Sequence, residues 1–319
     1  MKIVVLDGYT LNPGDNSWAP LEEVGDVEIH ERSTPAEVTV RGKDADVLVV
    51  NKIRISKEHI QRLPNLKLVA VTATGYDCVD TTAARKKSVV VSNVPVYGTD
   101  SVAQFVFGQV LHLAHHITQH DAAVREGEWK ERGDFSFSLT PQMELVGKTM
   151  GIVGFGRIGR RVAELARAFG MRVVAHTKTE ESAPDYEGFE FLPLDKLARE
   201  SDVVSLHCPL THQTNGMINS GFLSKCKPNA FLINASRGAL VNETDLADAL
   251  NGGKLAGAAL DVLSNEPIGM DNPLLSAPNC VITPHMAWAS LEARKRLMQA
   301  TADNITAFKN GEPTNVVSV

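Results

Sequence analysis

The chain has 319 residues, of which 43% are hydrophobic and 22% are charged, a balance typical of a folded globular protein. This length favours two domains over a single core. The net charge of −6 argues against the broad basic surface that nucleic acid or an anionic membrane would require. We therefore expect a chain that binds neither nucleic acid nor a membrane.

The cysteines and the beginning of the chain bear on the cellular compartment. The four cysteines are widely spaced and form no metal-binding pair, so we expect free thiols in a reducing compartment. The apolar run Ile3–Leu6 is too short for a signal peptide. No stretch approaches the roughly 20 apolar residues that span a bilayer. These observations favour the cytoplasm.

Short β-branched runs recur between amphipathic stretches and form two successive series. The first series is Ile3–Leu6, Val47–Val50, Leu68–Val71 and Val89–Val91. The second series is Met150–Val153, Arg172–Ala175, Val203–Leu206, Ala230–Ile233, Ala256–Leu260 and Val281–Thr283. Runs that are apolar on both sides suit parallel strands covered by helices on both faces. The alternation predicts an α/β fold with two doubly wound parallel sheets.

Three long helical patterns lie between or after these runs. The first, Ser101–His120, follows Thr99 and Asp100, which are candidate caps. The other two patterns are Arg160–Phe169 and Ala289–Lys309. We therefore expect helices at all three places.

A glycine-rich turn follows the run Met150–Val153 and precedes the second helical pattern. Residues 154–159 read Gly-Phe-Gly-Arg-Ile-Gly. Glycines allow a tight turn and let a pyrophosphate approach the amides at a helix N-terminus, where the helix dipole is positive. We interpret the turn as a dinucleotide site formed by Gly154, Gly156, Arg157, Ile158 and Gly159; the alternative is a strand–helix turn that binds nothing.

The end of the next strand bears on the choice of cofactor. A site for NAD usually places a carboxylate there, roughly 20 residues after the turn, to accept hydrogen bonds from the ribose. This sequence has Thr177 and Lys178 instead. A hydroxyl and a cation suit the 2′-phosphate of NADPH better, unless Lys178 is only a solvated surface residue. We expect NAD(P)H as the cofactor, with a preference for NADPH.

Three further segments carry polar residues beyond the carboxyl ends of predicted strands: Asn234–Gly238, Asp261–Pro267 and Thr283–Trp288. Together with the glycine turn, they make the chain resemble the D-isomer-specific 2-hydroxyacid dehydrogenases over essentially its full length. The segments Val4–Thr10 and Ala73–Asp77 are most similar to the glycerate dehydrogenase (hydroxypyruvate reductase) branch. The resemblance implies a flavodoxin-like substrate domain, a Rossmann cofactor domain, and hydride transfer between NAD(P)H and a small 2-oxo or 2-hydroxy acid.

Three residues have the chemistry that reduction of a 2-oxo acid requires. Arg237 offers a planar fork of donors for a carboxylate and a carbonyl oxygen. His285 is a natural acid and base near neutral pH, and Glu266 can orient its ring and favour its protonated form. Each residue alone could also be an ordinary polar loop residue. The family uses Arg, Glu and His in these roles, so we expect this set to be catalytic.

The resemblance also implies contacts with the substrate and the cofactor. Backbone amides of Thr74, Gly75 and Tyr76 are expected to hold the substrate carboxylate, together with Arg237 and His285. Further contacts with the cofactor are expected from His207, Cys208, Pro209, Thr214, Ala235, Ser236, Arg237, Asp261, His285 and Ala287. The chain departs from many relatives at Gln104, where they carry Glu, and at Thr177, where they carry Asp.

The resemblance implies discontinuous domains and a homodimer. We expect a substrate domain of residues 1–98, completed by 288–319, and a cofactor domain of residues 99–287 that joins two copies. The segment Trp129–Phe137 is similar to an arm that reaches the partner. Phe135 or Phe137 would then line the partner's substrate site, unless both rings only pack the interface.

Other interpretations remain open at this point. His112, His116 and His120 have a spacing that could bind a metal, but a helix-face or subunit contact is the favoured interpretation and no metal is expected. Glu266 stands where formate dehydrogenases carry an amide, and phosphoglycerate dehydrogenases often add a regulatory domain, for which we expect no room after Val319. An NADH-sensing corepressor and a D-lactate-type dehydrogenase are further alternatives. We favour D-glycerate, hydroxypyruvate or glyoxylate as the substrate.

Overall fold

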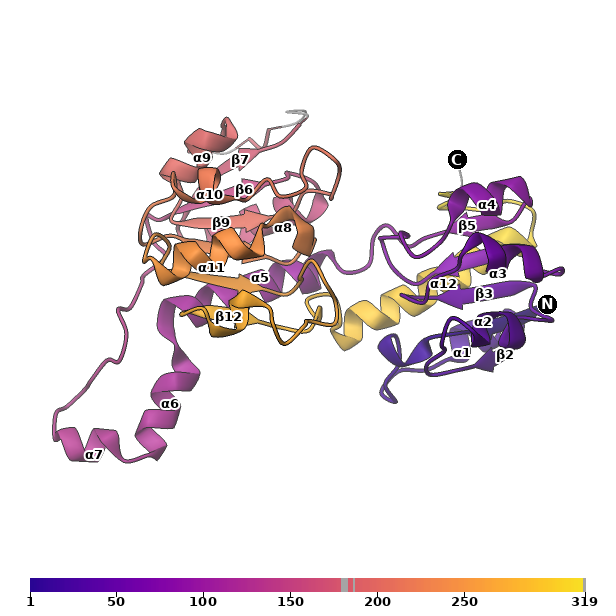
Figure 1. Cartoon of the computed structure of the whole chain (residues 1–319), viewed down its shortest axis with the longest axis horizontal. Helices are drawn as coiled ribbons and strands as arrows, with labels where there is room; N and C mark the ends of the chain where they lie inside the picture. Colours follow the sequence, from indigo (N-terminus) through magenta and orange to yellow (C-terminus); the bar gives the residue numbers. More distant parts are fainter. Residues whose placement is uncertain (179–182, 186, 318–319) are drawn as a thin grey trace. The chain divides into compact units, whose positions relative to one another are not determined.

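The computed structural model describes residues 1–178, 183–185 and 187–317. The chain divides into two compact units. The first unit comprises Met1–Gly98 and Trp288–Val319, and the second comprises Thr99–Ala287. Each unit is built on one parallel β-sheet with helices on both faces (Figure 1). The α/β fold with two doubly wound parallel sheets, predicted from the alternating apolar runs, is confirmed.

The sheet of the first unit has five parallel strands in the order β2-β1-β3-β4-β5. Four of them match predicted apolar runs: β1 (Lys2–Val5), β3 (Val47–Val50), β4 (Leu68–Val71) and β5 (Val90–Ser92). The fifth, β2 (Asp26–Ile29), lies at the edge of the sheet, and none of its residues is buried. An edge strand of this kind lacks the continuous apolar run that identifies an inner strand, so the sequence did not reveal it. This strand order is flavodoxin-like.

Helices cover both faces of the first sheet. One face carries α1 (Ala19–Glu22) and α12 (Leu291–Lys309); the other carries α2 (Glu37–Arg41), α3 (Lys57–Arg62) and α4 (Thr81–Lys86). The last helix of the chain, α12, packs Leu297, Met298 and Ile305 against the inner strands. This helix therefore completes the hydrophobic core of the first unit.

The second sheet has seven parallel strands in the order β12-β11-β10-β9-β6-β7-β8, which is a Rossmann order. Its strands are β6 (Thr149–Val153), β7 (Arg172–His176), β8 (Glu190–Phe191), β9 (Val203–Leu206), β10 (Phe231–Asn234), β11 (Gly257–Leu260) and β12 (Cys280–Ile282). One face carries α5 (Thr99–His115) and α8 (Arg157–Ala168); the other carries α9 (Leu194–Glu200), α10 (Ser220–Leu223) and α11 (Glu243–Asn251). The short strand β8 was not predicted, because two residues carry no readable pattern.

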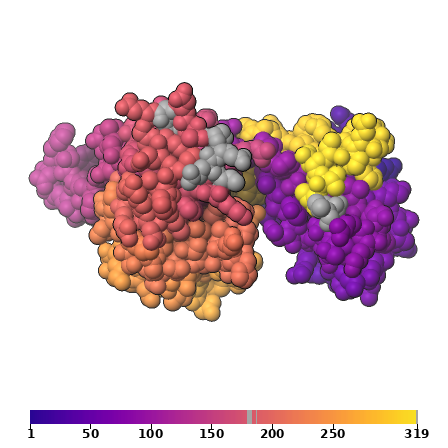
Figure 2. All heavy atoms as spheres, turned by 90° about the horizontal axis from the view of Figure 1, so that it is seen from above, coloured from indigo at the N-terminus to yellow at the C-terminus, as the bar shows by residue number. Residues whose placement is uncertain are grey.

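The helix predicted over Ser101–His120 is interrupted. It ends at His115, and His116 adopts a left-handed backbone with φ of 46°. A second helix, α6 (Ile117–Arg125), follows and is succeeded by α7 (Glu128–Arg132). We call residues 116–142 the arm; α6 and α7 stand away from the rest of their unit in both views (Figures 1 and 2). The break means that His112, His116 and His120 do not share one continuous helix face.

The described residues also form three short 3₁₀ helices, at Gly8–Thr10, Gly238–Leu240 and Pro273–Ser276. In the part of the chain that the structure describes, no helix is both long and apolar enough to cross a membrane. Nor do three or more His, Cys, Asp or Glu side chains of the described residues gather as a metal ion would require.

Candidate active site

The glycine-rich turn joins β6 to α8 at the carboxyl edge of the second sheet. Gly154 has φ of 98°, and a Cβ there would lie 2.4 Å from the backbone nitrogen of Cys208, so only glycine fits. A Cβ on Gly159 would lie 2.2 Å from the carbonyl oxygen of Gly154, so glycine is also required where α8 crosses the turn. A Cβ on Gly156 would meet no atom within 4 Å. The middle glycine therefore faces open space.

The N-terminus of α8 opens at the same place. Gly156 is the N-cap, and no side chain caps the first turn, which contains Arg157 and Ile158. The first N–H groups of this 12-residue helix therefore keep their donor capacity at the positive end of the helix dipole. The neighbours of β6 are β7 and β9, so the strand order reverses at this turn, where parallel sheets bind ligands. These features fit the pyrophosphate of a dinucleotide.

The next strand of the sheet, β7, ends at His176, and Thr177 and Lys178 follow it. Thr177 is partly exposed and Lys178 is exposed. Both residues lie at the carboxyl edge that carries the glycine turn. Neither Thr177 nor Lys178, the described residues directly after β7, is a carboxylate; residues 179–182, which include Glu180 and Glu181, lie outside the described part of the chain.

The loop after β9 carries His207, Cys208 and Pro209 and turns at Thr214. The Thr214 hydroxyl donates to the Pro209 carbonyl oxygen at 2.8 Å, and the Ser236 hydroxyl donates to the Cys208 carbonyl oxygen at 2.8 Å. Burial lowers the pKa of the His207 imidazole to about 4, so this ring is neutral near pH 7. Burial also raises the pKa of the Cys208 thiol, which makes it a poor nucleophile. This loop can therefore line a binding site, but neither His207 nor Cys208 is suited to act there as a proton donor or a nucleophile near pH 7.

Arg237 stands on the turn after β10, and Ala235 and Ser236 precede it. The buried Asn234 organises the turn: its Nδ2 donates to the Arg237 carbonyl oxygen at 2.9 Å, and its Oδ1 accepts from the Ser236 N–H at 3.1 Å. The guanidinium donates to the Ser236 carbonyl oxygen at 2.8 Å. Its other N–H groups make no hydrogen bond within the described residues, so they are available to a ligand.

Glu266 and His285 form a close pair. Glu266 follows β11, His285 follows β12, and the carboxylate Oε2 lies 2.7 Å from the imidazole Nδ1. The other carboxylate oxygen accepts from the Leu263 N–H at 3.0 Å, which fixes the orientation of the carboxylate. A carboxylate only accepts, so Nδ1 carries a proton and Nε2 lies on the opposite side of the ring. This arrangement orients an imidazole for proton transfer through Nε2.

The turn that carries His285 is held by Asp261. The Asp261 carboxylate accepts from the Thr283 hydroxyl at 2.6 Å and from the N–H groups of Met286 and Ala287 at 2.9 Å and 2.8 Å. His285 has φ of 53°, and its N–H donates to the Asp261 carbonyl oxygen at 2.8 Å. Burial raises the pKa of the Asp261 carboxyl, while these hydrogen bonds oppose the shift. Asp261 therefore fixes the backbone that presents the imidazole.

The loop after β4 in the first unit carries Thr74, Gly75 and Tyr76. The N–H groups of these three consecutive residues take part in no hydrogen bond within the described residues. Thr74 and Tyr76 are exposed and Gly75 is partly exposed. Consecutive unpaired amides of this kind can bind an anion such as a carboxylate.

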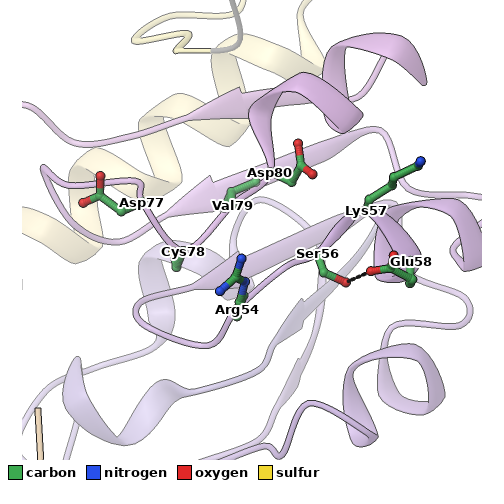
Figure 3. Close-up of a pocket in the computed structure, with 8 residues that line it drawn as sticks. All are labelled: Arg54, Ser56, Lys57, Glu58, Asp77, Cys78, Val79 and Asp80. Atoms are coloured by element: carbon green, nitrogen blue, oxygen red, sulfur yellow. Dashed lines mark hydrogen bonds between the residues drawn. The ribbon is translucent and has the colours of Figure 1, made fainter. Parts of the chain in front are cut away.

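A hollow of about 380 Å³ lies next to this loop, between the segments that follow β3 and β4 (Figure 3). Its lining includes Arg54, Lys57 and Asp77. Cys78 also lines it, and burial raises the pKa of that thiol to about 11. The thiol is protonated near pH 7, so the hollow contains no activated nucleophile.

The sequence comparisons place this geometry in a family. Residues 107–287 match the D-isomer specific 2-hydroxyacid dehydrogenase NAD binding domain. A relative that is 46% identical aligns with the whole chain. The chain belongs to the D-isomer specific 2-hydroxyacid dehydrogenases. It is an oxidoreductase of this family, which exchanges a hydride between a nicotinamide cofactor and a 2-oxo or 2-hydroxy acid.

Three relatives illustrate the match. Hydroxypyruvate reductase of Blautia hydrogenotrophica is 46% identical over 321 residues, covering 100% of both chains. Glycerate dehydrogenase of Methylorubrum extorquens is 38% identical, covering 99% of this chain and 98% of its own. An NADPH-dependent glyoxylate/hydroxypyruvate reductase from Sinorhizobium meliloti, solved with NADP and malonate, superposes with a TM-score of 0.82 at 33% identity, covering 99% of this chain and 96% of its own.

The structure gathers most of the sequence-predicted residues at the carboxyl edge of the second sheet. Arg237, Glu266 and His285 follow three adjacent strands, β10, β11 and β12. Ala287, the last residue of that unit, is buried and donates its N–H to Asp261. The supporting function of Asn234 was not predicted. A buried asparagine at a strand end resembles any polar loop residue until its hydrogen bonds are seen.

Proposed function

We propose that this enzyme reduces hydroxypyruvate to D-glycerate, and glyoxylate to glycolate, and that Arg237, Glu266 and His285 are its catalytic residues. The Glu266–His285 contact of 2.7 Å carries the proposal, because it orients an imidazole as a proton donor. The substrate names come from the hydroxypyruvate, glycerate and glyoxylate enzymes among the relatives. The first unit would be the substrate domain and the second unit the cofactor domain.

Each proposed residue has a defined chemical role. The amides of Thr74, Gly75 and Tyr76 bind the substrate carboxylate, and Arg237 donates to that carboxylate and to the ketone oxygen. His285 donates a proton from Nε2 to the ketone oxygen, and Glu266 stabilises the imidazolium that holds this proton before transfer. Bound NAD(P)H supplies the hydride that becomes the hydrogen on C2 of the product. The substrate thus gains one hydride and one proton.

The cofactor would be held by the glycine turn, the first turn of α8 and the loops after β7, β9 and β10. We propose that NADPH serves at least as well as NADH. Thr177 and Lys178 stand where a carboxylate would repel a 2′-phosphate, and they can donate to that phosphate instead. The site is near the surface, so the effect of Lys178 on affinity should be modest and weaker in salt.

The cofactor proposal predicts the effect of one substitution. Thr177→Asp should move the preference towards NADH, mainly by raising the KM for NADPH, because the new carboxylate repels the 2′-phosphate. The measurement is kcat/KM for both cofactors at low and moderate salt. Thr177→Ser is the matched control and should leave the preference unchanged. A wild-type preference for NADH above about tenfold, equivalent to about 1.4 kcal/mol, would contradict the proposal.

We also propose that two copies associate through the arm. Ile117, Val124, Trp129 and Phe135 expose apolar surface there, and the Phe135 side chain is 95% exposed. Phe137, by contrast, packs against His120 and under the Arg132 guanidinium. Phe135 is therefore the better candidate for a ring that reaches the partner's substrate site. The cysteines are unpaired, which fits the cytoplasm as the proposed compartment.

Steady-state kinetics test the proposed substrate. The panel is hydroxypyruvate, glyoxylate, pyruvate and phenylpyruvate against NADH and NADPH, followed through the absorbance of the reduced nicotinamide. The expected result is the highest kcat/KM with hydroxypyruvate or glyoxylate. A preference for pyruvate or phenylpyruvate would overturn the substrate assignment. Absence of turnover with every acid would overturn the catalytic proposal and favour a cofactor-sensing protein.

A further inference from the structure

Two buried asparagines flank the loop after β4, one from each neighbouring strand. Asn51 follows β3, is 3% exposed and donates from Nδ2 to the carbonyl oxygen of Thr72 at 2.7 Å. Asn93 follows β5, is 6% exposed and donates from Nδ2 to the carbonyl oxygen of Thr74 at 2.7 Å. Because β4 lies between β3 and β5, the loop is fastened on both sides.

The segment that begins at Asn51 is held by the carboxylate of Asp7. Asp7, which follows β1, accepts from the N–H groups of Asn51, Lys52 and Ile53 at 2.8, 2.6 and 2.8 Å. One carboxylate thus satisfies three consecutive amides at the exit of β3. These three hydrogen bonds hold the backbone at the exit of β3 in one conformation.

Asn93 determines the direction of an amide that the proposed function uses. In a trans peptide, the carbonyl and the following N–H point in opposite directions. The Thr74 carbonyl is fixed by Asn93, so the N–H of Gly75 points away from Asn93. In the same way, the Ala73 carbonyl accepts from the Val94 N–H at 3.0 Å, so the N–H of Thr74 points away from β5.

We propose that Asn93 is a positioning residue that holds the Thr74 and Gly75 amides in the geometry that binds a substrate carboxylate, with Asn51 supporting the other side of the loop. This inference rests on the proposed function, because that function assigns the carboxylate to these amides. It adds a role for a side chain that touches neither the substrate nor the cofactor. Burying a side-chain amide costs free energy unless the amide is hydrogen-bonded. The hydrogen bond to the Thr74 carbonyl oxygen therefore accounts for a buried asparagine at this position.

The primary variant is Asn93→Leu, which is similar in size and uncharged and leaves the Thr74 carbonyl without its donor. We expect the KM for the oxo acid to rise by about tenfold to a hundredfold with kcat much less affected. The reason is that the amides bind the substrate carboxylate equally in the ground state and in the transition state. The carboxylate is common to all substrates. The factor should therefore be the same for hydroxypyruvate and glyoxylate, and the dissociation constant of NADH should not change.

The control is Thr301→Val, which removes a buried hydroxyl that donates to the Leu297 carbonyl oxygen within α12 of the same unit. It should lower Tm without raising KM. Asn93→Ala is the second variant if the leucine variant does not fold. An unchanged KM in folded Asn93 variants would overturn the inference. So would parallel losses in kcat and NADH affinity, because these would indicate general disruption.

A binding experiment separates failure of this inference from failure of the proposed function. Calorimetric titration with oxalate, in the presence of NADH, measures carboxylate binding without turnover. If the wild type lacks activity with every oxo acid but binds oxalate, and Asn93→Leu weakens that binding about tenfold or more, the inference stands and the proposed function fails. Equal oxalate affinity in wild type and variant overturns the inference.

Discussion

The backbone at His285 shows how one residue is prepared for its proposed task. Its left-handed conformation is uncommon for a residue with a side chain and persists only where the surroundings impose it. Here Asp261 binds both sides of the residue, through its carbonyl oxygen and its carboxylate. Glu266 then fixes the ring itself. The imidazole is therefore oriented by the fold without help from a substrate.

The Glu266–His285 pair predicts a loss of catalysis when the carboxylate is replaced. Glu266→Gln should lower kcat for oxo-acid reduction with the KM much less affected, because the imidazole loses the charged partner that orients its ring. The measurement is kcat and KM with hydroxypyruvate.

Two comparisons test the Glu266 result. Glu243→Gln changes another carboxylate of the same unit, one that accepts from Ser264 and Asn272, and it should leave kcat unchanged. A kcat for Glu266→Gln equal to that of the wild type would remove Glu266 from the proposed catalytic set.

Arg237 predicts a large effect from a substitution that preserves charge. Arg237→Lys should reduce kcat/KM by roughly two to three orders of magnitude, because an ammonium cannot reproduce a planar fork of donors. Arg157→Lys, at the start of α8, is the matched control and should affect the KM for cofactor instead. Near-normal kcat/KM in the Arg237 variant would mean that another group binds the carboxylate and the ketone.

Site residues that could be predicted from the sequence differ from those that could not in the kind of interaction they make. Arg237, Glu266 and His285 could be proposed because each has a distinctive chemistry and follows an apolar run. Asn51, Asn93 and the anchoring role of Asp261 could not, since their function lies in hydrogen bonds to the backbones of distant segments. Such partners are set by tertiary structure and leave no local pattern.

At the scale of elements, the beginning of the chain is joined to α12 by an ion pair. Arg294 on α12 is buried and binds both carboxylate oxygens of Asp15, at 2.5 Å and 2.7 Å, and it also donates to the Leu11 carbonyl oxygen. The Arg294 guanidinium holds the pKa of the Asp15 carboxyl below its ordinary value. The pair therefore stabilises the folded state when Asp15 is ionised.

This ion pair predicts a pH-dependent loss of stability. Asp15→Asn should lower Tm by a few degrees near pH 7, since it leaves a buried guanidinium without its carboxylate. A carboxyl whose pKa is lowered by folding contributes stability above its unfolded pKa and loses it as the pH falls. The difference in Tm between wild type and variant should thus shrink below about pH 4. Glu312→Gln, an exposed acid of the same unit, should change Tm little at any pH, whereas a pH-independent difference for Asp15→Asn would contradict the ion-pair explanation.

The elements also show where sequence patterns lose information. The inner strands were predictable because burial on both faces requires continuous apolar runs. The helix break at His116 was not predictable. The residues on either side keep a helical pattern, and a histidine can adopt a left-handed backbone without any change in the local sequence pattern. The pattern for α8 began too late, at Arg160, because its first turn is formed by the glycine motif itself.

At the scale of the whole molecule, the arm predicts how copies associate. Ile117 and Val124 lie two turns apart on α6 and are 66% and 42% exposed. The double variant Ile117→Asp with Val124→Asp should convert a dimer into monomers, because it places charges in the proposed apolar interface. The measurement is the molar mass by light scattering or sedimentation. Met270→Asp, a site 87% exposed on the same unit, is the control and should leave the mass unchanged.

A second measurement concerns Phe135. Phe135→Ser should preserve the dimer and raise the KM for hydroxypyruvate severalfold if the ring reaches the partner's substrate site. A dimer with unchanged KM would limit Phe135 to interface packing. A wild-type protein that is monomeric at micromolar concentration would exclude the association altogether.

The position of α12 has a consequence for how the chain is made. The first unit cannot close its core until Leu297, Met298 and Ile305 have left the ribosome, since these residues cover the face of a sheet whose strands were translated more than 200 residues earlier. The second unit is continuous, so it can fold while the first still exposes apolar surface. We therefore expect the second unit to fold before the first, the reverse of the usual order in which the N-terminal domain folds first during synthesis. The N-terminal sheet is then expected to expose apolar surface until α12 has been made.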